Sequence, residues 1–266
     1  MIQDIKGHVA VVTGGAQSMG LLTSKELVKL GAKVVIGDVL PVGAEEVAKI
    51  NAEAGSTVAV FQTCDVCDPD ALQALIDRAV SEFGRFDILV NNAGVLDKPW
   101  EQDPTGEYAR RCIDINVRAL IDGTNRALHY WSQEEGRAGT VVNLASSAGY
   151  APISFMAAYT ASKAAVVMYT KSLATLAPKV RVNAVAPVWV DTKFIMADHI
   201  GQDHYTIKVT GLIHPDTVVA EIIKLVVDSQ YAGDIIRIEN GKEPYFDSTP
   251  KSTHVEARLK NAAQAM

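Results

Sequence analysis

Short runs rich in valine and isoleucine alternate with longer amphipathic stretches along most of this chain, and this alternation limits the possible folds more than any other feature. We expect strands at residues 8–13, 33–38, 57–62, 87–91, 140–144, 180–185 and 234–238, and helices at residues 21–30, 42–54, 69–83, 105–133, 157–176 and 215–229. Runs such as residues 9–12 are apolar at every position, which is typical of strands covered on both faces. The pattern predicts an α/β fold, a single doubly wound sheet of seven parallel strands with helices on both faces.

The chain shows no sign of a division into two domains. Its 266 residues are enough for one large core, and no linker rich in proline, glycine and serine interrupts the alternating pattern. The character of the sequence changes only near Asn240, after which turn-forming residues precede a polar, alanine-rich end. We therefore expect one domain over residues 1–240 and a C-terminal extension over residues 241–266.

The charge balance and the apolar patterning exclude several classes of partner. The formal net charge is −6, so the chain lacks the basic face that nucleic acid or an anionic membrane would require. No apolar run approaches the ~20 residues of a membrane span, and residues 1–8 do not resemble a secretory signal. We expect a cytoplasmic protein that binds neither nucleic acid nor membrane.

The cysteines do not form a recognisable framework. There are three, Cys64, Cys67 and Cys112, an odd and sparse set for a chain of this length. Cys64 and Cys67 have the CxxC spacing of redox pairs and of half a zinc site, but no second pair follows at a zinc-like interval. This spacing favours a strand end followed by a turn, and we expect no bound metal.

A glycine-containing loop lies where a dinucleotide would bind. The first predicted strand runs into residues 13–20, which contain Gly14 and Gly20, and a helix follows. Glycines let the backbone approach a pyrophosphate, whose charge meets the free N–H groups of the helix N-terminus. Asp38 ends the second strand, where its carboxylate suits the ribose hydroxyls of the adenosine and would repel a 2′-phosphate. Gln17 and Val39 offer that phosphate no positive charge, so the pattern predicts a Rossmann fold with NAD as cofactor.

Several motifs in register resemble those of the short-chain dehydrogenase/reductase superfamily, over roughly residues 5–240. Besides the glycine loop, they are the acidic turn at Asp65, the NNAG motif at residues 91–94, Asn116, Ser146, and the YxxxK motif of Tyr159 and Lys163. Residues 31–38 and 83–90 are similar to the NAD-dependent 15-hydroxyprostaglandin dehydrogenase type. Residues 158–178 and 212–215 are similar to insect alcohol dehydrogenases of the same superfamily.

The resemblance implies a cofactor site and a catalytic set, residue by residue. The implied cofactor contacts are Gly14, Gln17, Ser18, Met19, Gly20, Asp38, Val39, Asp65, Val66, Asn92, Ala93, Gly94, Tyr159, Lys163, Pro187, Val190 and Thr192. The implied catalytic residues are Asn116, Ser146, Tyr159 and Lys163. In this family pattern Lys163 also holds the nicotinamide ribose, and Asn116 positions a water that relays the proton.

Elementary chemistry explains the spacing of the YxxxK motif. Tyr159 and Lys163 are four residues apart, so they share one face of a helix. An ammonium group, or the positive ring of an oxidised nicotinamide, favours the phenolate and lowers the tyrosine pKa. Tyr159 can then accept the proton of an alcohol while the carbinol hydride goes to the nicotinamide. The Ser146 hydroxyl would hydrogen-bond the substrate oxygen as charge develops there.

Two positions depart from the family pattern. Ser18 replaces the central glycine of the loop, so its side chain must fit beside the phosphates or the adenosine ribose. Val188 follows Pro187 where the family has glycine. Because valine adopts a positive φ only with difficulty, we expect the turn beneath the nicotinamide to differ there.

The segments after the fourth, fifth and sixth strands supply the expected substrate pocket. Its predicted substrate contacts are Ser146, Ala148, Ile153, Tyr159, Trp189 and Phe194. Further apolar candidates are Leu96, Trp100, Tyr150, Phe155, Met156, Ile195 and Met196. This lining suits a hydrophobic secondary alcohol or its ketone. The resemblance also implies a homodimer or homotetramer.

Three functions remain open at this point. The first is an NAD-dependent dehydrogenase that transfers a hydride between NAD(H) and a hydrophobic secondary alcohol, with tyrosine as general acid and base. The second is a biosynthetic ketoreductase that works in the reducing direction. The third is a non-redox NAD-binding Rossmann protein, which Ser146, Tyr159 and Lys163 disfavour because a binding module needs no proton relay.

Overall fold

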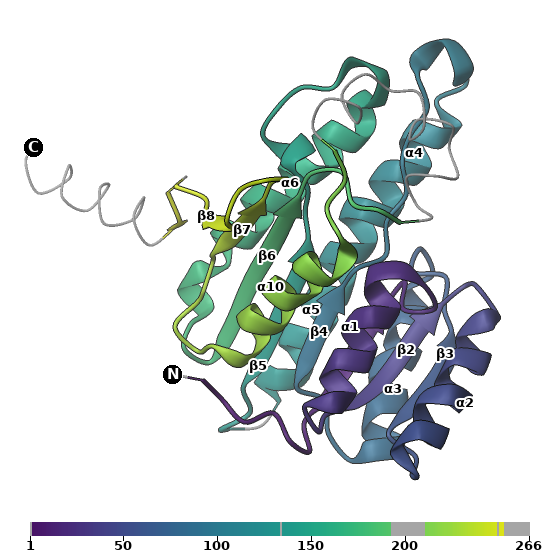
Figure 1. Ribbon diagram of the computed structural model, residues 1–266, viewed down its shortest axis with the longest axis vertical. Coiled ribbons are helices and arrows are strands. Elements are labelled where there is room, and N and C mark those ends of the chain that lie inside the picture. The colour runs from purple at the N-terminus through teal and green to yellow at the C-terminus, as the bar shows by residue number, and fades with distance from the viewer. Residues whose placement is uncertain (1, 134, 193–210, 249, 253–266) are drawn as a thin grey trace, which may run out of the picture.

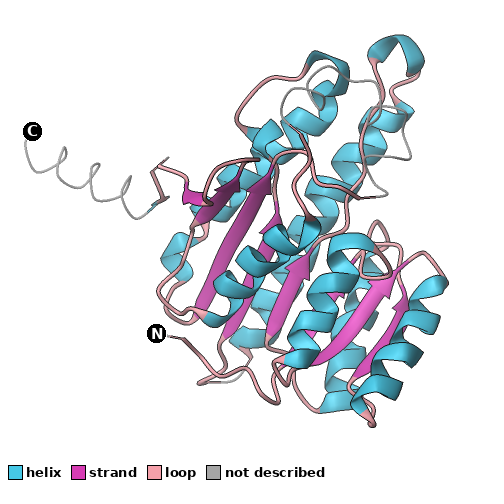
Figure 2. Cartoon of the chain, in the orientation of Figure 1, coloured by secondary structure: helices cyan, strands magenta, loops and turns pink. Residues whose placement is uncertain are grey.

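The computed structural model describes residues 2–133, 135–192, 211–248 and 250–252 (Figure 1). Its strands form one sheet, seen side by side in Figure 2. They are β1 (Val9–Thr13), β2 (Lys33–Asp38), β3 (Ala59–Thr63), β4 (Ile88–Asn91), β5 (Gly139–Leu144), β6 (Val180–Pro187), β7 (Ile235–Ile238) and β8 (Tyr245–Phe246). The order across the sheet is β3-β2-β1-β4-β5-β6-β7-β8. The seven predicted strands are confirmed with small shifts at their ends, and all of them pair in parallel.

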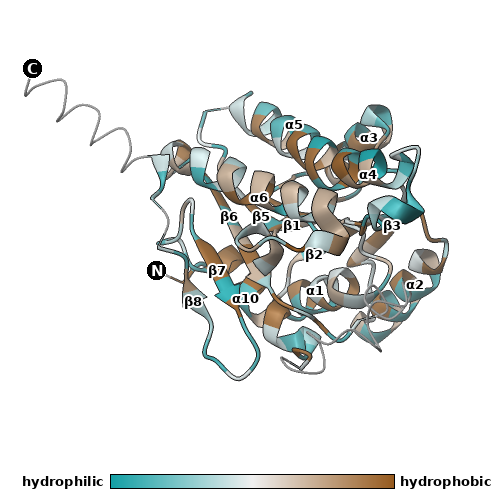
Figure 3. Cartoon of the chain, turned by 90° about the horizontal axis from the view of Figure 1, so that it is seen from above, coloured by the Kyte–Doolittle hydropathy of each residue, from teal (hydrophilic) through white to brown (hydrophobic). Residues whose placement is uncertain are grey.

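Helices cover both faces of the sheet, as the alternating pattern predicted. They are α1 (Ser18–Lys29), α2 (Val42–Ala54), α3 (Pro69–Phe83), α4 (Glu107–Ile113), α5 (Leu120–Ser132), α6 (Ala157–Ser172) and α10 (Pro215–Val227). Seen from above, α1, α2 and α10 lie on one side of the strands, with α3, α5 and α6 on the other (Figure 3). None of the described helices is both long and apolar enough to cross a membrane.

Alternate residues of each central strand enter two separate cores. Ala10 and Val12 of β1 pack with Leu27 of α1 and with Leu225 of α10. Val9 and Val11 point to the opposite face, where they join the cluster that includes Trp131 of α5. Because side chains alternate across a strand, a buried parallel strand must be apolar at nearly every position. This two-sided burial is the physical reason for the continuous valine and isoleucine runs.

Local capping chemistry sets the ends of the best-predicted helices. The Asp68 side chain accepts a hydrogen bond from the N–H of Asp70 at the start of α3, and Pro69 occupies the first helical position. Gly84 ends α3 in the left-handed conformation, as Gly55 ends α2. The predicted bounds of α2 and α3 are therefore confirmed at both ends.

The long helix predicted at residues 105–133 is not one regular α-helix. It begins at Glu107 and contains a π-helical turn, Asp114–Ala119, between α4 and α5. A π-helical turn inserts extra backbone without interrupting the helix, so the apolar periodicity that predicts a helix does not reveal it. Asn116 lies within this turn.

An eighth strand, β8, extends the predicted seven. It pairs antiparallel with β7, and the Phe246 ring stacks on Tyr231 at a centroid distance of 4.8 Å. The strand has only two residues, too few for a periodic signal. Next to it, the Asp247 carboxylate forms a 2.7 Å ion pair with the Nζ of Lys171 on α6, where the two side chains are 7% and 2% exposed. This buried ion pair links the end of the sheet to the helix α6.

We expect Lys171→Met to lower the free energy of unfolding by about 3–5 kcal/mol, because it leaves the Asp247 carboxylate buried without its partner. Urea denaturation at fixed protein concentration measures this change. Lys29→Met is the matched control, since Lys29 pairs with Glu26 on the exposed face of α1 and its loss should change stability little. Equal stability of the two variants would show that the Lys171–Asp247 pair does not hold β8 in place.

Candidate active site

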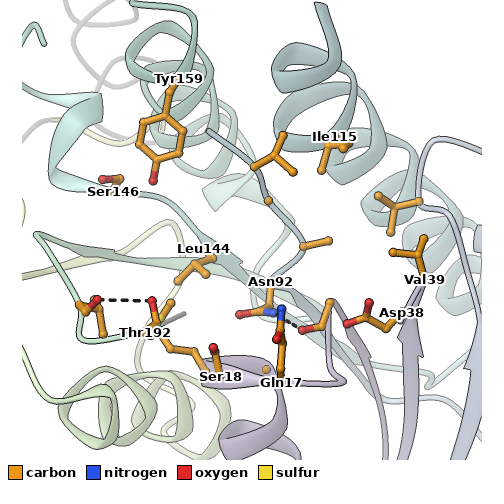
Figure 4. Close-up of a pocket in the computed structure, with 18 of the residues that line it drawn as sticks. Gln17, Ser18, Asp38, Val39, Asn92, Ile115, Leu144, Ser146, Tyr159 and Thr192 are labelled. Atoms are coloured by element: carbon orange, nitrogen blue, oxygen red, sulfur yellow. Dashed lines mark hydrogen bonds between the residues drawn. The ribbon is translucent and has the colours of Figure 1, made fainter. Parts of the chain in front are cut away.

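A cleft of about 330 Å³ opens at the carboxyl ends of the parallel strands. It lies beside β1, whose neighbours are β2 and β4, the point at which the strand order reverses. In open α/β sheets this reversal separates the loops on either side and leaves a crevice for ligands. The residues drawn in Figure 4 enter the cleft from the ends of β1, β2, β4, β5 and β6 and the loops after them, from α6 and from the π-helical turn.

All the residues predicted to contact the cofactor line this one cleft. They are Gly14, Gln17, Ser18, Met19, Gly20, Asp38, Val39, Asp65, Val66, Asn92, Ala93, Gly94, Tyr159, Lys163, Pro187, Val190 and Thr192. The cleft is also lined by residues that the sequence analysis did not select, among them Leu40, Arg111, Ile115 and Leu144. Arg111 and Ile115 are one turn apart on the helical segment after β4, so only the fold shows that this face meets the cleft.

The glycine loop folds tightly on itself and against the loop after β4 because Gly14 and Gly20 carry no Cβ. A Cβ at Gly20 would lie 2.3 Å from the carbonyl oxygen of Gly14, and a Cβ at Gly14 would lie 2.8 Å from Cα of Ala93. The helix α1 then begins without a side-chain cap, so no side chain occupies its first N–H groups. This tight turn in front of an uncapped helix N-terminus fits the pyrophosphate of a dinucleotide.

Ser18 adopts the left-handed backbone conformation that favours glycine. Its φ is +49°, and it is the one non-glycine residue with a positive φ in the described part of the chain. The left-handed region costs a residue with a Cβ roughly 1–2 kcal/mol. The loop therefore retains its shape at some cost in local strain.

Asn92 of the NNAG motif ties the glycine loop to the end of β4. Its Nδ2 donates hydrogen bonds to the carbonyl oxygens of Thr13 (3.0 Å) and Gly14 (2.8 Å). The Thr13 hydroxyl oxygen accepts in return from the N–H groups of Asn92 and Ala93, each at 3.2 Å. The glycine loop is thus held against the loop after β4 by four hydrogen bonds.

Asp38 joins the cleft at the end of β2, where its carboxylate is mostly buried. One oxygen accepts from the N–H of Ala16 at 2.9 Å, and the other accepts from the N–H of Leu40 at 3.0 Å. Each carboxylate oxygen can accept a further hydrogen bond. The side chain therefore both braces the glycine loop and lines the cleft at the end of β2.

The CxxC segment is a turn, in agreement with the sequence analysis. Cys64 follows β3, and the Asp65 carboxylate accepts a hydrogen bond from the N–H of Cys67 at 2.9 Å. Burial, followed by the charge of Asp65, raises the pKa of the Cys64 thiol to about 12. Such a thiol is a poor nucleophile and a poor metal ligand. Within the described residues, no group of three potential ligands could hold a metal ion.

The structure brings Ser146, Tyr159 and Lys163 together. Ser146 follows β5, and its hydroxyl accepts from the N–H of Ala148 (3.2 Å) and donates to the carbonyl oxygen of Pro187 (3.4 Å). Tyr159 and Lys163 project from α6, with the lysine Nζ 5.5 Å from the centre of the tyrosine ring. Figure 4 shows the Tyr159 hydroxyl directed toward the cleft on the side where Ser146 lies.

Desolvation dominates the protonation of this pair. Burial raises the pKa of the Tyr159 phenol to about 12, and the Ser146 hydroxyl opposes this shift by a hydrogen bond. Burial also lowers the pKa of Lys163 to about 8, although its Nζ donates a 2.6 Å hydrogen bond to the carbonyl oxygen of Leu144. The expected lowering of the tyrosine pKa by the ammonium group is therefore outweighed by burial in the protein alone.

Asn116 lies behind the cleft rather than on its wall. Its side-chain oxygen accepts from the N–H of Val95, and its Nδ2 donates to the carbonyl oxygen of Val95 and to the Ser162 hydroxyl. Both the oxygen and the nitrogen of the amide therefore have hydrogen-bond partners within the protein. From within the π-helical turn Asp114–Ala119, the amide holds the loop after β4 against α6.

A second cavity of about 490 Å³ adjoins the cleft and shares Ser146, Tyr159 and Val188 with it. Five predicted substrate contacts line this cavity, namely Ser146, Ala148, Ile153, Tyr159 and Trp189. Phe194, with Ile195 and Met196, lies outside the described residues. Of the further candidates, Leu96, Phe155 and Met156 line the cavity, whereas Trp100 is 78% exposed on the surface. The sequence analysis missed Arg237 in this lining, although it is the one charge in the apolar run of β7.

The turn after β6 is built without a positive φ at Val188. The N–H of Val188 donates to the carbonyl oxygen of Ile238, and Val190 pairs with Ile213. The Thr192 hydroxyl donates to the carbonyl oxygen of Val190 at 3.3 Å (Figure 4). The segment from Val188 to Thr192 is thus braced by neighbouring strands rather than by a glycine turn.

Comparisons with known proteins agree with this geometry. A family model described as short chain dehydrogenase matches residues 8–203. The chain is 34% identical to 15-hydroxyprostaglandin dehydrogenase (NAD+) of Homo sapiens, over 92% of this chain and 97% of that protein. It is 38% identical to cis-4-hydroxycyclohexanecarboxylate dehydrogenase of Sinomonas cyclohexanicum, over 71% and 75% of the two chains.

A solved structure has the same architecture. The 3-ketoacyl-(acyl-carrier-protein) reductase from Brucella melitensis, complexed with NADH, superposes with a TM-score of 0.79 and 31% identity, over 89% of this chain and 98% of that one. The chain therefore belongs to the short-chain dehydrogenase family, and it is an NAD-dependent oxidoreductase.

Proposed function

We propose that this NAD-dependent oxidoreductase converts hydrophobic secondary alcohols into ketones, reversibly. The observation that carries the proposal is that Ser146 and Tyr159 line the dinucleotide cleft and the apolar cavity at once. If the substrate oxygen lies between these two hydroxyl groups, the carbon that carries it lies where the dinucleotide cleft meets the apolar cavity. The names of the two relatives support it, since each denotes a dehydrogenase of a hydroxylated compound.

The residues of this chain divide the proton chemistry among them. The cleft residues, Asp38 and Asn92 among them, would hold NAD, which would supply the acceptor for the hydride of the carbinol carbon. Tyr159 takes the hydroxyl proton as general base, and the Ser146 hydroxyl donates a hydrogen bond to the substrate oxygen. Lys163 supplies the positive charge that favours the phenolate, and Asn116 keeps the loop after β4 in register with α6. The same proton transfer can run in reverse, with Tyr159 donating its proton to the oxygen of a ketone, as a biosynthetic ketoreductase would require.

The catalytic unit in this proposal is residues 1–240, acting in the cytoplasm. Residues 241–266 form an extension whose β8 adds to the sheet edge. A non-redox NAD-binding protein is the weaker alternative, because it would have no use for a desolvated tyrosine beside a lysine whose pKa burial lowers to about 8.

We expect Tyr159→Phe to lower kcat for NAD-dependent oxidation of 2-octanol by about 10²–10⁴-fold, because it removes the general base. NADH formation followed at 340 nm measures the loss. Tyr169→Phe is the matched control, since Tyr169 lies on the same helix and its hydroxyl contacts Asn125 instead of the cleft. Full activity of Tyr159→Phe would exclude the mechanism.

The pH profile follows from the same roles. Oxidation requires the deprotonated tyrosine, so kcat/KM for the alcohol should rise with pH up to about 8. Ketone reduction uses the protonated phenol and should change little over the same range, because the pKa of Tyr159 is about 12. Because Lys163 has a pKa of about 8, its support for the phenolate weakens above that value. Lys163→Met should move the rise to higher pH, and an unshifted profile would remove Lys163 from the relay.

We expect Asp38→Ala to reduce the preference for NAD over NADP, measured as the ratio of kcat/KM values, by at least tenfold. The change removes the carboxylate that repels a 2′-phosphate. It also removes two acceptors for backbone N–H groups, so Asp38→Asn, which keeps an acceptor, separates the charge from the bracing. Comparable affinity of the unmodified protein for both cofactors would refute this role.

We propose that the chain forms a homodimer or homotetramer through its α4 and α6 faces. Ile113 of α4 is 39% exposed and Met168 of α6 is 54% exposed, which is unusual for large apolar side chains on adjoining helices. Light scattering at micromolar concentration should give a mass above the monomer, and Met168→Lys should reduce it. A monomeric mass for the unmodified protein would contradict the proposal.

A further inference from the structure

Arg237 stands out in the apolar cavity beside the catalytic residues. It lies on β7, between β6 and β8, and its Cα is in register with Ala186 of β6 (Figure 1). Its neighbours Ile236 and Ile238 belong to the core on the other face of the sheet. Among the described residues that line the cavity, Arg237 is the one with a formal charge. A lone guanidinium in such a lining is costly unless an anion compensates for it.

Two aromatic rings hold the guanidinium in place. Its central carbon lies 4.6 Å from the centre of the Tyr150 ring and 5.3 Å from that of Tyr245. Cation–π contacts of this kind orient the side chain without using its hydrogen-bond donors. Arg237 is therefore positioned before any ligand arrives, a condition for selective binding.

Only part of its hydrogen-bonding capacity is used. Nη2 contacts the Glu239 carboxylate at 3.2 Å, whereas Nε is buried and has no hydrogen-bond partner. Glu239 is itself shared, because Lys242 and the Tyr245 hydroxyl also donate to it. Two cations thus share one carboxylate. The next acid, Asp247, forms the buried ion pair with Lys171. Among the described residues of this cluster, the cations Arg237, Lys242 and Lys171 therefore outnumber the carboxylates of Glu239 and Asp247.

We infer that the cavity accepts alcohols that carry a carboxylate, and that Arg237 binds this carboxylate. This inference rests on the function proposed above and narrows its substrate class to hydroxy acids. A guanidinium donates a pair of parallel hydrogen bonds that match a carboxylate, and these bonds are strong when desolvated. The oxygen to be oxidised lies beside Ser146, which follows β5.

The sheet geometry sets a rough length for the substrate. β5 and β7 are separated by β6, so two inter-strand spacings of about 4.8 Å, or roughly 10 Å, lie between their backbones. A hydroxyl and a carboxylate joined by several methylene groups, or by a ring with a short arm, can span this distance. The apolar side chains between them, such as Ile153, would contact the connecting carbons.

Matched substrates test the charge alone. We would measure kcat/KM with NAD for 7-hydroxyoctanoate, its methyl ester and 2-octanol. The unmodified protein should prefer the acid to the ester by at least tenfold, and Arg237→Met should reduce that ratio by at least tenfold. Arg237→Lys keeps the charge but not the paired donors, so it should retain part of the preference. The control is Arg78→Met on α3, whose side chain pairs with Glu82 on the surface and should leave the ratio unchanged.

Binding without turnover provides a second readout. Titration calorimetry of octanoate into the protein mixed with NAD should show binding that Arg237→Met weakens at least tenfold, with methyl octanoate as the neutral comparison. Oxidation of 2-octanol with no preference for the acid would overturn the inference and leave the proposed function intact. Absence of all turnover would instead defeat the proposed function, and octanoate binding that depends on Arg237 would then still support the anion site. Octanoate that binds no better than methyl octanoate would overturn the inference that Arg237 binds a carboxylate.

Discussion

The reversal of strand order between β1 and β4 is the constraint on which the rest of this structure depends. Parallel strands buried on both faces leave only their ends free, and the reversal forces the loops after β1 and β4 apart. The Asn92 amide then joins those loops through Thr13 and Gly14. A single side chain thereby holds the glycine loop against the loop after β4 and places Gly94 near Lys163. The cofactor cleft is a consequence of sheet topology, and Asn92 of the NNAG motif sets the spacing of the two loops that border it.

Burial sets the protonation of the two groups that we propose to be catalytic. The helix α6 packs against one face of the sheet, and burial moves the pKa of Tyr159 upward while it moves that of Lys163 downward. Both shifts favour the neutral form of the group, yet with a pKa of about 8 Lys163 still holds its proton near neutral pH. A positive charge brought into the cleft would favour the phenolate more strongly here than in water, because the local dielectric is low. The protonation of Tyr159 therefore depends on the charge of the molecule bound in the cleft.

Features set by residues close in sequence could be predicted, whereas features set by contacts between distant segments could not. The bounds of α2 and α3 could be predicted because Pro69, Gly55 and Gly84 act locally, within one turn of the helix end. The cleft-lining residues could be named because the motifs resemble those of the short-chain dehydrogenase family, and the loops that carry them follow parallel strands and so meet at one edge. The π-helical turn at Asn116 and the pairing of β8 depend on tertiary contacts, which leave no period in the sequence. Arg237 was missed for the same reason, because only the sheet shows that it faces the cavity of Ser146.

The central claim is that hydride leaves the carbinol carbon of a secondary alcohol at the junction where Ser146 and Tyr159 meet the dinucleotide cleft. The most direct measurement uses 2-octanol deuterated at carbon 2, with mass spectrometry of the NADH that forms. The account predicts one deuterium in each NADH and a slower reaction than with the undeuterated alcohol. NADH without deuterium, or a deuterated alcohol recovered unchanged while NAD is bound, would contradict it.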